Sequence, residues 1–431
     1  MTAMIMFGFA IVFLMLGFPV AFVFGSLAII FGFFVPDLGL MVFNLLPFRM
    51  YGIMQNFTLM SVPLFILMGL ILEKSNMAKL LLESMGKLFG SIRGGLAVSV
   101  IVVGALLAAS TGIVGASVVM MSVIALPLML KHGYSKTLAT GTITAGGTLG
   151  QIIPPSIVLI VLADQMSVSV GDLFKAAVIP GLLLVGSYII YILIYAWKNP
   201  SKAPALKSEE PYSKIVKESL KAIIAPILLM ITVLGSIFAG VASPTESAAI
   251  GVVGATLLGW IQKSLGFGKL FEAAKESVRL TGMIFMILFG ATAFSLVFNE
   301  LGGSDMILDF FADDVGSAYA FILIAMLVIF LLGFFIDFIE IAFIVVPILV
   351  PIVEEFGINP IWFGILIAMN LQASFLTPPF GFALFFLKGA AGNLVTTMQI
   401  YKGVIPFIGI QLFVLLLVIL FPALALMMVT D

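Results

Sequence analysis

The chain has 431 residues, of which 62% are hydrophobic and only 10% are charged. Soluble domains carry about 25% charged residues, so this composition excludes a water-soluble protein and indicates a polytopic membrane protein. The 20 basic and 21 acidic residues nearly cancel, which argues against a nucleic-acid-binding protein, because that class has a basic surplus. The sequence has no cysteine, which excludes thiol nucleophiles and cysteine-ligated metals.

Apolar runs follow one another along the chain, and a helix needs about 20 such residues to cross a bilayer. Two runs, 95–131 and 318–353, are too long for one span and lack a polar linker for two, so each predicts a re-entrant hairpin. Two others, 137–165 and 361–388, contain Pro-Pro and predict broken helices, since proline removes a helical hydrogen bond. The remaining runs predict ordinary spans near 3–17, 19–35, 58–73, 172–197, 219–240, 245–262, 281–299 and 403–429.

The two halves of the chain resemble each other when one is shifted by 224 residues. The shift places Pro127 on Pro351 and Pro154-Pro155 on Pro378-Pro379. We therefore predict an all-α protein of two repeats, as in many secondary transporters. The predicted parts are a first repeat at 1–197 (scaffold spans 1–73, hairpin 94–131, broken helix 137–165), a cytoplasmic linker at 198–218, and a second repeat at 219–431 (scaffold spans 219–299, hairpin 317–355, broken helix 360–388).

Basic residues predict the orientation of these repeats. Each repeat is expected to have three spans, a hairpin that returns to its own side, and two more spans. The number of crossings in a repeat is then odd, so the second repeat is expected to be inverted. Placing the linker in the cytoplasm puts all basic residues except Arg49 and Lys175 on the cytoplasmic side, as the positive-inside rule requires. The N- and C-termini are then periplasmic.

The hairpin tips and helix breaks are the predicted functional segments, because irregular backbone at membrane depth is tolerated only where it is buried or lines a cavity. The tips span 108–117 and 332–342, and the breaks span 144–156 and 369–381. Free carbonyls and hydroxyls there suit a hard cation such as Na⁺, and helix N-termini suit a carboxylate. Asp337 and Glu340 are costly intramembrane carboxylates. A helix cap is the alternative role for Asp337 and for Glu246.

Several motifs together resemble the large membrane subunit of the tripartite ATP-independent periplasmic (TRAP) transporters. They include RGGLAVSVIVVGALLAASTGIVGAS from Arg93, SPTESAAIG from Ser243 and FLTPPFGFALFFLKGAAG from Phe375. The resemblance implies an elevator-type transport domain moving against a scaffold in a bacterial inner membrane, driven by a Na⁺ gradient. It also implies two separate partners, a small four-helix membrane subunit and a periplasmic substrate-binding protein.

The resemblance also implies positions for the ligands. One Na⁺ site would use the first tip and first break, a second would use the second tip and second break, and the substrate would lie beside the breaks. Ser117 stands where some members have Asp, which reduces the charge at the first tip. The implied residues are Ser110, Thr111, Gly112, Ser117, Gly146, Gly147, Gly150 and Ile153 for the first Na⁺; Asp337, Glu340, Gln372, Ser374 and Thr377 for the second; and Thr148, Gln151, Pro154, Asn370 and Pro378 for the substrate.

We therefore expect the membrane subunit of a Na⁺-driven uptake transporter for small organic anions, with no cofactor besides the coupling ion. A stand-alone Na⁺/carboxylate cotransporter of the same architecture is an alternative, and transport by the purified chain alone would favour it. An ion channel is a weaker alternative, marked by conductance independent of substrate. An enzyme is not expected, since the sequence has a single histidine, His132, and no GxxxxGK[ST] motif for ATP.

Overall fold

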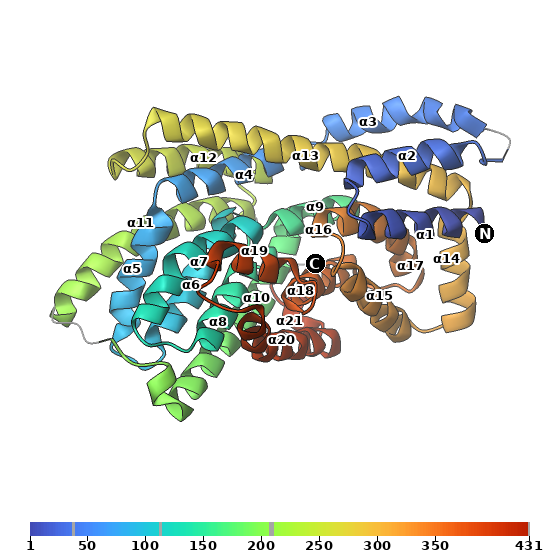
Figure 1. Ribbon diagram of the computed structural model, residues 1–431. Helices are drawn as coiled ribbons and strands as arrows, with labels where there is room; N and C mark the ends of the chain where they lie inside the picture. Colours follow the sequence, from blue (N-terminus) through green and yellow to red (C-terminus); the bar gives the residue numbers. More distant parts are fainter. Residues whose placement is uncertain (37–38, 112–113, 207–210, 430–431) are drawn as a thin grey trace.

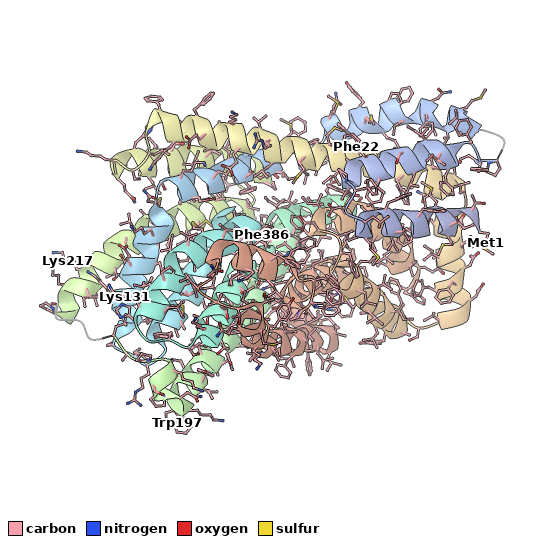
Figure 2. The ribbon with its side chains drawn as sticks, in the orientation of Figure 1. Met1, Phe22, Lys131, Trp197, Lys217 and Phe386 are labelled. Carbon is pink, nitrogen blue, oxygen red and sulfur yellow. The ribbon has the colours of Figure 1, made fainter. Side chains whose placement is uncertain are left out.

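The computed structural model describes residues 1–36, 39–111, 114–206 and 211–429, and their regular structure is helical. Five helices in this part of the chain are long and apolar enough to cross a membrane. The elements form two groups, which we call the outer layer and the inner bundle (Figure 1). In Figure 2 apolar side chains such as Phe22 and Trp197 point away from the ribbon, as expected of a surface that faces lipid.

The outer layer is built from helices of both halves. In it α12 packs on α4, and α13 packs on α2, α3 and α4. Gly290 of α13 lets this packing be close, because a Cβ there would lie 2.6 Å from the carbonyl oxygen of Ala21 in α2. Its elements are α1 (Thr2–Met15), α2 (Val20–Gly32), η1 (Gly39–Leu45), α3 (Leu46–Met54), α4 (Ser61–Lys74), α5 (Met77–Gly90), α11 (Tyr212–Phe238), α12 (Pro244–Ile261), α13 (Phe267–Glu300), α14 (Gly303–Asp309) and η4 (Phe310–Val315).

The inner bundle holds the two long apolar runs, each divided into two helical arms. The first run forms α6 (Gly95–Thr111) and α7 (Val114–Lys131), which pack on each other. The second forms α15 (Ala318–Leu332), a short α16 (Phe338–Glu340), the π-helical η5 (Ile341–Val345) and α17 (Val346–Glu355). The first predicted tip includes residues 112 and 113, which lie outside the described residues, and the second includes the segment between α15 and α16.

The two Pro-Pro segments interrupt helices, as predicted. The first separates α8 (Lys136–Thr148) and η2 (Leu149–Gln151) from α9 (Ile157–Gln165). The second separates α18 (Pro360–Leu376) from α19 (Phe382–Ala391). Both Pro-Pro bonds are cis. The two breaks are neighbours in space, because η2 and α9 pack against α18.

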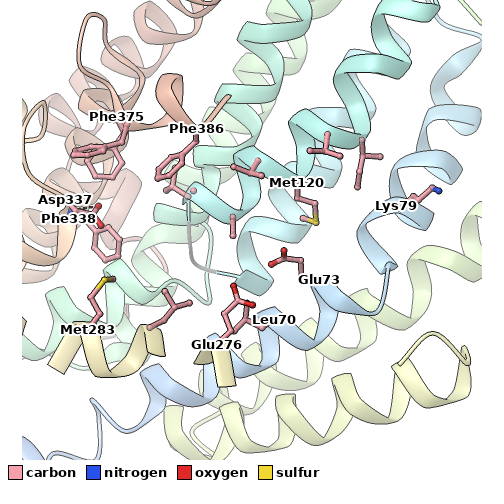
Figure 3. Close-up of a pocket in the computed structure, with 18 of the residues that line it drawn as sticks. Leu70, Glu73, Lys79, Met120, Glu276, Met283, Asp337, Phe338, Phe375 and Phe386 are labelled. Atoms are coloured by element: carbon pink, nitrogen blue, oxygen red, sulfur yellow. Dashed lines mark hydrogen bonds between the residues drawn. The ribbon is translucent and has the colours of Figure 1, made fainter. Parts of the chain in front are cut away.

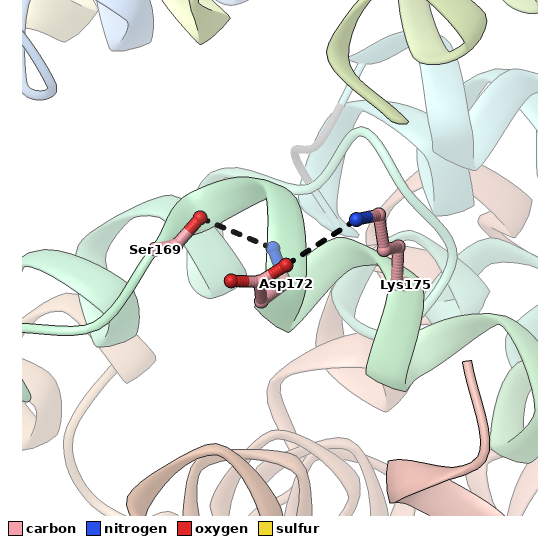
Figure 4. Close-up of polar contacts among 3 residues, drawn as sticks. All are labelled: Ser169, Asp172 and Lys175. Atoms are coloured by element: carbon pink, nitrogen blue, oxygen red, sulfur yellow. Dashed lines mark hydrogen bonds and ion pairs between the residues drawn. The ribbon is translucent and has the colours of Figure 1, made fainter. Parts of the chain in front are cut away.

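The bundle is closed by α10 (Val170–Lys198) and α20 (Thr397–Leu420), with the short η3 (Pro200–Lys202) and α21 (Ala423–Leu426) after them. Local hydrogen bonds set the start of α10, where the Ser169 hydroxyl accepts from the Asp172 amide and Lys175 lies 3.4 Å from the Asp172 carboxylate (Figure 4). A Thr396–Gln399 capping box begins α20 in the same way. Glycines let α20 cross α8 closely, since a Cβ on Gly403 would lie 2.3 Å from the Thr137 carbonyl oxygen.

The order of elements in the second half follows that in the first. An interval of 224 residues separates the starts of α2 and α12, and also of α8 and α18. Contacts repeat in exchanged form: α4 packs on α12 while α13 packs on α2, and α8 packs on α20 while α10 packs on α18. Each half thus completes the packing of the other.

Three predicted boundaries differ from the observed ones. α13 begins at Phe267 rather than near residue 281, because Ala273 and Ser277 give its charged first half a buried face. α11 begins at Tyr212, inside the predicted linker 198–218, with Ile215 and Ser219 buried. The last apolar run, 403–429, is divided at Phe421 and Pro422.

Glu246 forms a capping box with Ser243, the N-cap residue of α12. The role of Glu246 is therefore to cap this helix together with Ser243.

Candidate functional site

A cavity of about 850 Å³ lies between the outer layer and the inner bundle. Figure 3 shows side chains from both groups pointing into it, with Glu73 and Glu276 near one end and Asp337 and Phe375 near the other. Its other lining residues are Leu70, Asn76, Lys79, Val114, Gly115, Ala116, Val119, Met120, Val123, Ile124, Leu280, Met283, Phe338, Phe382 and Phe386.

Charged side chains at the end of α4 and in α13 form the outer-layer wall. Glu73 and Glu276 line this wall, and the ammonium of Lys74 lies 2.9 Å from a carboxylate oxygen of Glu276. Lys79 at the start of α5 is the one basic residue of the described lining. The cavity therefore carries charge at this end, while its bundle side is mostly apolar.

The bundle wall is formed by α7 and α16, which follow the two hairpin tips, and by the second broken helix, α18 and α19. The start of α7 packs closely against α19, since a Cβ on Gly115 would lie 2.9 Å from the ring of Phe386. The second tip contributes Asp337 and Phe338, and Phe375 and Phe382 flank the second break. The tips and the break that the sequence singled out therefore border one cavity.

Asp337 is the cap of α16. The Phe338 amide donates to its Oδ1 at 2.8 Å, and Asp337 is one of the residues that line the cavity. Glu340 follows one turn later and is 6% exposed. Its Oε2 has no hydrogen-bond partner within the described part of the chain. The helix-cap role of Asp337 is thus observed.

The residues predicted for the first Na⁺ site come from elements that pack together. Gly147 of α8 packs against α7, because a Cβ there would lie 2.5 Å from Val118, and Gly104 of α6 approaches the Gly146 carbonyl. Ser117 is buried, and Gly150 and Ile153 lie in the adjoining break. Ser110 and Thr111 end α6, whereas their side chains and residue Gly112 lie outside the described residues.

Three residues predicted for the second Na⁺ site lie at the end of α18 or just after it, and the other two lie in α16 and at its N-cap. A Cβ on Gly333 in the second tip would lie 2.2 Å from Ser374 Oγ, so this tip contacts α18 directly. The hydroxyls of Ser374 and Thr377 donate to carbonyls of their own helix. Gln372 is fully buried, and neither side-chain polar atom of it has a partner among the described residues.

The predicted substrate residues do not line the cavity. Thr148 donates to the Ala145 carbonyl, and Asn370 donates to the Met326 carbonyl at 2.6 Å, so both have structural hydrogen bonds. Gln151 is fully buried, and neither of its side-chain polar atoms has a partner within the part of the chain that the structure describes. Pro154 and Pro378 shape the breaks, and neither is among the lining residues.

Buried amides without partners are the chemically informative feature of this region. A buried polar group without a hydrogen bond costs about 1–3 kcal/mol, and Gln151 and Gln372 carry this cost on elements that contact each other, η2 and α18. An amide oxygen is a good ligand for a hard cation. No cluster of three His, Cys, Asp or Glu suited to a metal occurs in the described chain.

Sequence reasoning missed the charged wall. The sequence indicated Lys74 and Lys79 as cytoplasmic basic residues and did not indicate Glu73 and Glu276 as lining residues. The available signal was a run of charged and polar residues, Glu73 to Lys79, directly after an apolar helix. Its proximity to Glu276 depends on the packing of α13 on α4.

Comparison with known families gives a match over most of the chain. Residues 7–424 match the family described as "Tripartite ATP-independent periplasmic transporter, DctM component". The "C4-dicarboxylate TRAP transporter large permease protein DctM" of Pseudomonas aeruginosa is 31% identical over 383 residues, covering 88% of each chain. The "Isethionate TRAP transporter permease protein DctMQ" of Oleidesulfovibrio alaskensis is 27% identical over 97% of this chain and 65% of that protein.

A solved structure has the same fold at low sequence identity. The crystal structure of the Alcanivorax borkumensis YdaH transporter superposes with a TM-score of 0.65, covering 95% of this chain and 97% of that one, at 14% identity. At this identity the likeness concerns the fold alone. It agrees with an all-helical polytopic membrane protein.

Proposed function

Because the chain belongs to the DctM component family of the TRAP transporters, which are permeases and not enzymes, we propose that it carries small organic anions inward on a Na⁺ gradient. The observation that carries the proposal is the single cavity bordered by both hairpin tips, a helix break and the outer layer. A substrate held there would contact both helix groups. A relative movement of the groups would then change the side of the membrane to which it is exposed.

The coupling ion would be held by the breaks and tips. Gln372 in α18 and Asp337 in the second tip carry side-chain oxygens that would hold the ion in the second half, and the side-chain oxygen of Gln151 would do so at the first break. When bound, Na⁺ would supply positive charge that this part of the cavity lacks. Since Lys79 lies at the other end, the ion would support binding of an anion near Asp337.

The two-group architecture supports an elevator movement of inverted repeats. The outer layer would act as scaffold, and the bundle of α6–α10 and α15–α20 would move. The exchanged contacts of the two halves are those that two related repeats produce. The domain boundaries at 197 and 219 then separate the repeats, with α11 extending into the linker.

Two partners are part of the proposal. The family description names a tripartite system, and the DctMQ relative contains a further third that this chain does not match. We therefore expect a small membrane subunit on the outer layer and a periplasmic protein that delivers the substrate. The relatives named for C4-dicarboxylates and isethionate point to small anions as the substrate class.

Reconstitution tests the proposal. The chain with its small subunit and binding protein should take up a C4-dicarboxylate into proteoliposomes when Na⁺ is imposed outside, and uptake should stop when the Na⁺ gradient is dissipated. Equal uptake with a proton gradient alone would contradict Na⁺ coupling. Uptake by the chain without partners would favour the stand-alone cotransporter instead.

A further inference from the structure

A hydrogen bond links the outer layer to the inner bundle near the start of α4, away from the Glu73 end of that helix. The Asn56 amide, in the turn between α3 and α4, donates to the Asp164 carboxylate at the end of α9. From this contact we propose that Asn56 and Asp164 form a latch that holds the protein in the state seen here, in which the lining residues Glu276 and Lys79 near the Lys74 end of the cavity are exposed. The inference rests on the proposed function, in which the two groups move.

The donor side of the latch is preorganised by its own turn. The Asn56 Oδ1 accepts from the amides of Thr58 and Leu59 at 2.9 and 3.2 Å, which orients the side-chain amide. The same turn is attached to α12, because Thr245 Oγ1 donates to the Phe57 carbonyl at 2.6 Å. Asn56 therefore belongs firmly to the outer layer.

The acceptor side is fixed to the bundle. Asp164 ends α9, which packs on α16, η5, α17 and α18. Gln165 Nε2 donates to the second carboxylate oxygen of Asp164 at 2.8 Å, so both oxygens are engaged. Any sliding of the bundle against the outer layer has to break the Asn56–Asp164 bond, whereas the bonds within each side can persist.

The position of the latch defines the state that it stabilises. α4 has 14 residues and is therefore about 21 Å long. Asn56 lies just before it, and Glu73 lines the cavity at its far end. The second half has no equivalent of this pair, because Leu280 and Lys388 stand 224 residues after Asn56 and Asp164, and the Lys388 ammonium donates to the carbonyls of Gly392 and Val395. The latch thus favours one of the two states.

Cysteine cross-linking tests the latch in a chain that has no cysteine of its own. In the reconstituted complex, Asn56→Cys with Asp164→Cys should cross-link and lose uptake, and reduction should restore it. The control pair is Ser236→Cys with Ser247→Cys, whose hydroxyls lie 2.8 Å apart within the outer layer. This pair should cross-link without loss of uptake. A cross-linked latch pair that still transports would overturn the proposal.

A second measurement does not depend on transport. Val119→Cys lines the cavity, and its labelling by a membrane-impermeant maleimide can be compared from the two sides of oriented vesicles. Adding Asp164→Ala should shift the ratio of the two labelling rates about tenfold away from the Lys74 side, since one hydrogen bond to a charged group is lost. Adding Gln165→Ala should shift it less. An unchanged ratio in Asp164→Ala would refute the latch, whereas absent uptake with a shifted ratio would refute only the proposed function.

Discussion

Two buried glutamines of the inner bundle differ in how they are satisfied. Gln372 has no hydrogen-bond partner in the described chain. Gln411 accepts from the Tyr188 hydroxyl at 2.8 Å and donates to the Met369 carbonyl at 3.0 Å. Burial alone therefore does not identify a functional amide, because one of these residues supports packing and the other is left available.

The contrast predicts opposite effects on stability. Gln372→Met should raise the free energy of unfolding by about 1 kcal/mol, since it removes an unsatisfied buried group, and it should also weaken Na⁺-dependent uptake. Gln411→Met should lower the free energy of unfolding by about 1–3 kcal/mol, because the Tyr188 hydroxyl and the Met369 carbonyl lose a partner. Thermal unfolding of the purified variants in detergent measures both. A destabilised Gln372→Met would show that Gln372 has a structural role.

Asp337 combines a helix cap with a carboxylate charge, and a substitution separates these roles. Asp337→Asn should keep the hydrogen bond to Phe338, and therefore keep expression and assembly. The Na⁺ concentration for half-maximal uptake should rise about tenfold, because the variant loses a charge that attracts the cation. An unchanged Na⁺ concentration for half-maximal uptake would show that Asp337 serves only as a helix cap.

The residues at the tips and breaks could be proposed from sequence because proline, glycine and carboxylates are improbable in hydrocarbon without a reason. The separate role of each residue could not be proposed from the sequence. Asn370 and Thr148 stay predictions for substrate contact, and the structure adds their hydrogen bonds to the Met326 and Ala145 carbonyls. Side-chain partners of this kind depend on tertiary packing, which no local pattern contains.

At the scale of elements, hydrophobic runs predicted where helices occur but not where they begin. Phe267–Glu300 is a single helix, although its first half is too polar to resemble a span. Packing of one face on α4 sets its start, and that face becomes visible only when α4 is in place. The pairing of α8 with α20 was equally invisible, since the small residues that permit it lie far apart in sequence.

The α8–α20 crossing predicts a sharp difference between two glycines of one helix. Gly403→Ala should destabilise the protein by about 1–3 kcal/mol, the usual cost of overpacking, because its Cβ would lie 2.3 Å from the Thr137 carbonyl oxygen. Gly409→Ala should be neutral or slightly stabilising, since open space surrounds that position. Thermal unfolding in detergent compares the two. Equal behaviour of both variants would exclude a close helix crossing at Gly403.

At the scale of the whole molecule, the distribution of basic residues predicts its orientation in the membrane. Ser201→Cys, in the segment between the halves, should react with an impermeant thiol reagent only from the cytoplasmic side. Glu354→Cys, at the exposed end of α17, should react only from the periplasm. Labelling of Ser201→Cys from outside in intact cells would reverse the proposed topology.

The packing of α8 on α20 has a consequence for how the protein is made. Thr140 donates to the Gln399 carbonyl across 259 residues of sequence, which a ribosome needs about 13–52 s to add. During this interval α8, which contains several threonines, lies in the membrane without its packing partner α20. The growing chain therefore needs a temporary packing partner for α8, such as an insertase or the neighbouring α6 and α7, until synthesis of the second half is complete.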